Sequence, residues 1–100
     1  MQTFNITSAT TTTLKEIHGR EGSINSIRMT NTSQSTSVRV NLFFEDSSSN
    51  KFYVAATDIP GLTSLLLTEG LKFSNSTFAL KVTTSAGGLS TSTPLSVIIK

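Results

Sequence analysis

The sequence predicts an all-β protein, an antiparallel β-sandwich of seven to eight short strands. Apolar and polar residues alternate along most of the chain, turn-forming residues recur between the alternating segments, and 16 Ser and 17 Thr supply polarity in place of charge. Successive side chains of a strand face opposite sides of a sheet, so each segment has one core face and one wetter face. Two packed sheets bury these core faces, as a jelly roll or as an immunoglobulin-like Greek key.

The N-terminal segment, residues 1–13, is poor in charge and stands apart from the strongest strand pattern. We expect it to be an extended arm that reaches onto a neighbour, with a single sandwich domain over residues 14–100. The first strands are expected at Thr11–Ile17 and Ile24–Thr30, and the turn His18–Gly22 separates them.

A hairpin follows, with strands Ser37–Phe44 and Lys51–Thr57 joined by Glu45–Asn50. Alternation predicts that its core faces carry Val38, Val40, Leu42 and Phe44 on the first strand, and Phe52, Val54 and Ala56 on the second. The next turn contains Pro60-Gly61, a pair that suits the centre of a type II turn, with Gly61 at positive φ.

The segment Leu62–Glu69 is compatible with two helical turns or with a strand. We favour a strand because the segment is short, lies between β-rich segments and is followed by Gly70. The last strands are expected around Phe78–Val82 and Leu95–Ile99. The loop between them, Ser85–Pro94, carries the least apolar surface, and we expect mobility or a contact there.

The residue types predict no catalytic, cofactor-binding or metal site, and no enzyme activity. The chain has no cysteine and a single histidine, His18, in a turn, and its carboxylates are not arranged as a catalytic pair. Asp46 with Ser47, Ser49 and Asn50 offers loose coordination for a cation, but serine hydroxyls are weak ligands, so a solvated hairpin tip is the better interpretation.

The charge distribution argues against a nucleic-acid partner. The formal net charge is +2, and the eight Lys and Arg residues are spread along the chain, whereas nucleic-acid binding favours a basic cluster. A small stripe of Arg28 and Arg39 on one sheet face is the alternative to scattered solubilising charges. No apolar run approaches the ~20 residues of a membrane span, so no membrane association is expected.

An apolar surplus marks the candidate protein-protein contact. Alternation places four apolar residues on the otherwise polar sides of their strands: Phe43, Tyr53, Leu66 and Ile98. An exposed apolar patch of this kind is typical of an interaction site. The alternative is that curled strands bury both faces.

The order of these segments resembles that of small β-sandwich structural proteins of tailed bacteriophages, of the marine and cyanobacterial phage type. The resemblance covers about Ile24 to Lys100, and it lies in Ile24–Asn31, Val38–Asp46, Lys51–Val54, Ile59–Leu67, Gly70–Phe73 and Phe78–Val82.

This resemblance implies a virion protein made in the host bacterial cytoplasm and forming a homo-oligomer. Its role would be that of a capsid decoration or cement protein on the major capsid protein, or of a neck, tail or fibre-base ring component. A carbohydrate- or ligand-binding sandwich module is the competing function, although the chain has no Trp and one Tyr.

Overall fold

Ten β-strands and no helix occur in the part of the chain that the computed structural model describes, residues 2–17, 21–34, 36–68, 70–74, 76–86 and 92–100. They are β1 (Gln2–Ser8), β2 (Thr11–Lys15), β3 (Glu21–Ile24), β4 (Ile27–Asn31), β5 (Val38–Asp46), β6 (Lys51–Ile59), β7 (Thr63–Leu67), β8 (Leu71–Ser74), β9 (Phe78–Ala86) and β10 (Ser92–Ile99). The predicted antiparallel sandwich is confirmed, but with ten strands in place of seven or eight.

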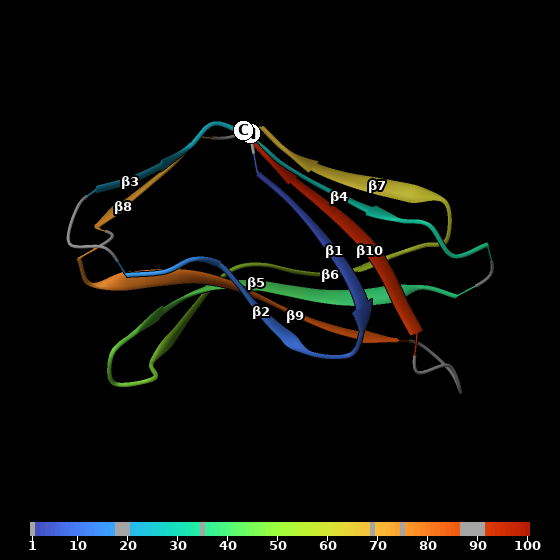
Figure 1. The fold of residues 1–100 in the computed structure, drawn as a ribbon, viewed down its shortest axis with the longest axis horizontal. Coiled ribbons are helices and arrows are strands. Elements are labelled where there is room, and N and C mark those ends of the chain that lie inside the picture. Colours follow the sequence, from blue (N-terminus) through green and yellow to red (C-terminus); the bar gives the residue numbers. More distant parts are fainter. Residues whose placement is uncertain (1, 18–20, 35, 69, 75, 87–91) are drawn as a thin grey trace.

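The strands pair in a nested order, and each pair is antiparallel (Figure 1). β1 pairs with β10, β2 with β9, β3 with β8, β4 with β7, and β5 with β6. Two further pairings complete a sheet of order β1-β10-β4-β7 and a sheet of order β2-β9-β5-β6. We call them sheet A and sheet B.

Nesting distinguishes between the two predicted topologies. An immunoglobulin sandwich pairs several strands that are consecutive in the chain, whereas here only β5 and β6 are both consecutive and paired among the described strands. The arrangement is a jelly roll, with β3 and β8 as an additional two-stranded ribbon.

The core lies between the two sheets and follows the predicted alternation. Val38, Val40 and Leu42 of β5 are fully buried, as are Leu80 and Val82 of β9. The cluster consists of Ile6, Leu14, Ile24, Ile27, Met29, Val38, Val40, Leu42, Ile59, Leu80, Val82, Leu95, Val97 and Ile99. Phe44 and Val54, two residues of the predicted core faces, are only partly buried and pack against its margin.

A β-bulge in β6 overturns the predicted core face of that strand. Leu42 of β5 lies opposite Ala55, but the next residue, Phe43, lies opposite Tyr53, so Val54 is an extra residue in β6. A bulge shifts the alternation by one residue. Ile59 is therefore buried and Ala56 is exposed, whereas Phe52, on the other side of the bulge, stays opposite Phe44 on the predicted face.

The predicted single strand Ile24–Thr30 is divided in two. β3 ends at Ile24, and β4 begins at Ile27. In between, the backbone N–H groups of Asn25 and Ser26 donate to the carbonyl of Lys100 at 2.7 and 3.1 Å. The chain leaves the β3–β8 ribbon here and enters sheet A, which accounts for one of the additional strands.

Residues 1–13, expected as an arm, pair with the domain from Gln2 onward instead of extending away from it. β1 forms an edge of sheet A and β2 an edge of sheet B, and Ile6 belongs to the core. In the loop Ser85–Pro94, β9 runs to Ala86 and β10 begins at Ser92, and residues 87–91 lie outside the described residues, as does His18.

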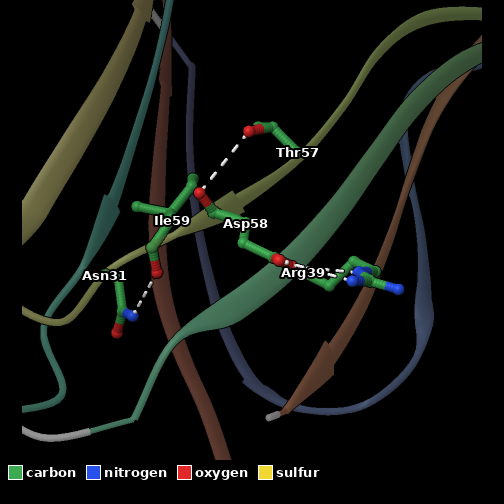
Figure 2. Close-up of polar contacts among 5 residues, drawn as sticks. All are labelled: Asn31, Arg39, Thr57, Asp58 and Ile59. Atoms are coloured by element: carbon green, nitrogen blue, oxygen red, sulfur yellow. Dashed lines mark hydrogen bonds and ion pairs between the residues drawn. The ribbon is translucent and has the colours of Figure 1, made fainter.

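Buried polar residues mark two crossings between the sheets. Asn31, at the end of β4, donates from Nδ2 to the carbonyls of Thr36 and Ile59, both at 2.8 Å, and its Oδ1 accepts from the N–H of Ser33 at 2.9 Å. The bond to Ile59 is drawn in Figure 2. At the β1-to-β2 crossing, the Thr84 hydroxyl donates to the carbonyl of Ser8 at 3.2 Å. Such bonds satisfy backbone groups at or just beyond the ends of strands.

Gly61 is required because its backbone passes close to that of Ser33. The prediction that Gly61 adopts a positive φ is wrong. The residue with positive φ in this turn is Leu62, at 57°. A Cβ atom on Gly61 would lie 2.6 Å from the backbone oxygen of Ser33. The strand prediction for the segment that follows is confirmed, because Thr63–Leu67 forms β7.

We predict that Gly61→Ala destabilises the fold by about 1–3 kcal/mol, because the added methyl group meets backbone in a packed corner. Gly70→Ala is the matched control, since its Cβ would have only an ordinary contact, 3.7 Å from the Ile24 oxygen. Urea denaturation measures both, and equal stabilities of the two variants would contradict the proposed contact.

We predict that Asn31→Asp costs about 3–5 kcal/mol at neutral pH, because the buried carboxylate oxygen that replaces Nδ2 would face the carbonyl oxygens of Thr36 and Ile59 with no hydrogen between them. Asn41→Asp, on the outer face of sheet B, should change the free energy of unfolding by less than about 1 kcal/mol. Thermal unfolding followed by circular dichroism compares the two variants. An equally small loss of stability in both would show that Asn31 does not stabilise the crossing from β4 to β5.

Candidate protein-contact surface

One candidate contact patch lies on the outer face of sheet B, where β5 and β6 pair. Phe43 and Tyr53 are directly opposite each other, with ring centroids 5.6 Å apart, and the Lys51 ammonium lies 5.3 Å from the centroid of Phe43. Tyr53 is 61% exposed, but Phe43 is 2% exposed. Phe43 and Tyr53 are the two predicted contact residues in this patch, and only Tyr53 offers surface to a partner.

The opposite side of the same hairpin carries an aromatic cluster. Phe44 packs on Phe73 and Phe78 with centroid distances of 4.8 and 6.2 Å, and Phe52 meets Phe78 edge-on at 5.8 Å. Phe52 stays about half exposed because the hairpin projects beyond the body of the sandwich (Figure 1). Alternation predicted Phe52 as a core residue. The length of the hairpin is the one sequence feature that could have indicated its exposure.

The hairpin tip is closed by Asp46. Its carboxylate accepts from the N–H groups of Ser48 and Asn50, both at 2.9 Å, and from the Asn50 side-chain amide at 3.1 Å. The backbone N–H of Asn50, followed by its side-chain amide, lowers the pKa of Asp46 below its usual value. These bonds occupy the carboxylate in shaping the turn, which favours the solvated tip over loose cation coordination.

A second patch lies on the outer face of sheet A. Ile98, Arg28 and Leu66 occupy neighbouring strands in one cross-strand row. Leu66 is 46% exposed and Ile98 is partly buried. Around them is a small hollow of about 80 Å³, lined also by Ser26 and Lys100. The four predicted contact residues therefore belong to two patches on opposite sheets.

Arg39 does not form a stripe with Arg28, because the two residues belong to different sheets. Arg39 instead forms a bidentate ion pair with Asp58, at 2.9 and 3.3 Å (Figure 2). This side-chain hydrogen bond lowers the pKa of Asp58. The pair borders a polar hollow of about 250 Å³ with Asn41, Ala56 and Thr57. Both partners are more than half exposed, so the pair contributes little to stability.

The part of the chain that the structure describes contains no group of three His, Cys, Asp or Glu side chains placed to hold a metal ion. None of its segments forms a helix long and apolar enough to cross a membrane. The large apolar side chains that are exposed in this part of the chain include Phe52, Tyr53, Leu62 and Leu66.

Comparison with known proteins yields structural likeness only. Neither a family model nor a curated protein matches the chain. The Anabaena sensory rhodopsin transducer is similar in structure, with a TM-score of 0.50 and 10% identity over 85% of this chain and 98% of that chain. At this identity the likeness shows a shared fold and carries nothing further.

Two structures of infectious bursal disease virus, of the Gt and Gx strains, are also similar, with TM-scores of 0.44 and 0.40 and identities of 13% and 15%. They match 99% and 98% of this chain, but the matches cover only 25% and 32% of the viral chains. Likeness at this level supports no functional argument.

We predict that the melting temperature falls on acidification below about pH 4, near the unfolded pKa of aspartate. Asp46 and Asp58 have lowered pKa values in the folded state, so their stabilisation is present above that pH and is lost as the pH falls through the lowered values. Asp46→Asn should reduce the melting temperature at neutral pH and flatten the acid dependence. If the melting temperature of the variant and that of the original chain depended on pH in the same way, Asp46 would not be the source of the acid sensitivity.

Proposed function

We propose that this chain is a non-enzymatic structural protein of a virion, and specifically a decoration protein on the outer shell of a tailed bacteriophage. The observation that carries the proposal is the projecting β5–β6 hairpin with two aromatic side chains, Phe52 and Tyr53, both more than half exposed. Aromatic side chains are enriched in protein interfaces and often dominate their binding energy.

The composition and fold are consistent with such a role. Only 14% of residues are charged, so copies packed side by side on a shell repel one another weakly. Jelly rolls are frequent in viral capsid domains, although they also occur in lectins, and fold alone does not decide function. The resemblance to small phage sandwich proteins adds the tailed-phage context.

In this proposal the partner is the major capsid protein, and binding involves neither nucleic acid nor membrane. The exposed ring of Tyr53 and that of Phe52 project from two sides of the hairpin, so a groove between shell subunits would bury both. A position in the neck, tail or fibre base uses the same surface against a different partner. The number of copies per particle distinguishes these two positions.

The first test is quantitative mass spectrometry of purified virions from the source of this chain. A decoration protein should be present in a number comparable with that of the symmetry-related shell positions. A copy number matching a single ring would instead support the neck or tail. Absence from the particle would refute the virion role, and saturable binding on a glycan array would then favour a carbohydrate-binding module.

We predict that Phe52→Ala and Tyr53→Ala each reduce occupancy on shells by about tenfold or more, as expected for interface anchors. Leu62→Ala is the matched control, because Leu62 is also apolar and is 69% exposed but lies on another turn. Rebinding of purified protein to undecorated shells measures occupancy, and circular dichroism verifies folding. Loss of binding in the Leu62 variant alone would place the contact elsewhere.

A further inference from the structure

The two sheets have four edge strands, and bulges disrupt two of them. In the β2–β9 pair, Thr13 lies opposite Lys81 and Lys15 opposite Leu80, so the extra residue is in β2. In the β5–β6 pair, the extra residue, Val54, is in β6, which also carries Lys51 and Asp58. Bulges and charges on an edge discourage another strand from pairing with it.

β1 has neither protection, although it is also an edge strand. Its register shift against β10 occurs where Ile6 pairs with Leu95 and Ser8 with Ser92. β10 advances three residues there and β1 two, so the extra residue is in β10 and β1 is regular. No charged residue occurs between residues 2 and 14. β1 therefore presents seven residues of unprotected edge.

The sequence of β1 is self-complementary about its central residue, Asn5. In an antiparallel pair of two β1 strands centred there, Phe4 of each copy lies opposite Ile6 of the other. Thr3 likewise lies opposite Thr7, which is a favourable cross-strand pair. Ile6 faces the core and Phe4 packs against its margin but is only partly buried, while Thr3, Asn5 and Thr7 are exposed. Pairing would thus extend both the apolar and the hydroxyl faces.

We propose that β1 is the site at which a second copy of this chain adds to sheet A, by antiparallel β1–β1 pairing about a two-fold axis at Asn5. The two four-stranded sheets become one eight-stranded sheet across the dimer. Such an interface is isologous, because both copies contribute the same strand. The inference depends on the strand edge alone and not on the virion role, so either can fail without the other.

β7 is the competing edge, since it is also uncharged and free of bulges. It is five residues long where β1 has seven, so fewer ladder hydrogen bonds can form. Self-pairing centred on Leu65 would also set the polar Ser64 opposite Leu66. β7 is therefore the less favourable site for a second copy, and its Ser64, which is exposed, provides the matched control position.

Sedimentation velocity of the full chain over a range of concentrations tests the proposal. The unchanged chain should form dimers. Asn5→Lys and Asn5→Asp should each raise the dissociation constant by about tenfold or more, because they place like charges opposite each other at the axis. An equimolar mixture of the two variants should restore the dimer through a Lys–Asp pair, whereas Ser64→Lys should dimerise as the unchanged chain does.

A chain that stays monomeric at all concentrations would overturn the proposal, as would dissociation by Ser64→Lys in place of the Asn5 variants. Failure of the mixture to restore the dimer, with both variants folded by circular dichroism, would overturn it as well. Hydrogen exchange of the unchanged chain gives a measurement free of substitutions. The β1 amides should gain protection as the protein concentration rises, and protection independent of concentration would count against pairing at this strand.

Discussion

The fold depends on how the chain crosses from one sheet to the other without leaving backbone groups unsatisfied. The crossing from β4 to β5 is held by the side chain of Asn31, which bonds to Ser33 and Thr36 of the connection itself and to Ile59 at the end of β6. An amide has both donors and an acceptor, and this corner uses both. Because a buried polar network is costly when partly satisfied, the corner tolerates few other residue types. Through its bond to Ile59, the corner ties the end of β4 in sheet A to the end of β6 in sheet B.

Sequence alternation predicted the sandwich and most of its core because the two-residue period of a strand is a local property. Val40, Leu42 and Leu80 are buried as expected. The bulge at Val54 could not be predicted in this way, since it exists only in the register between β6 and β5. The choice of a jelly roll over a Greek key was inaccessible for the same reason: the nested pairs join residues far apart in the chain.

The candidate site was predictable in its residue types but not in its geometry. Of the four residues of the apolar surplus, Tyr53 and Leu66 are exposed. The surplus did not indicate that Tyr53 covers Phe43, because that contact depends on side-chain directions across the bulged pair. It also could not place Leu66 on the other sheet, and Phe52 was missed because a core face becomes a surface where the hairpin extends beyond its covering sheet.

The nested pairing also determines how the molecule responds to force. Gln2 and Ile99 are partners in the outermost pair, β1–β10. Hydrogen bonds between antiparallel strands run perpendicular to the strands, so tension between these two residues would load the bonds one after another, as in a zip, and not all at once in shear. A load applied through the strand ends would open this protein at low force.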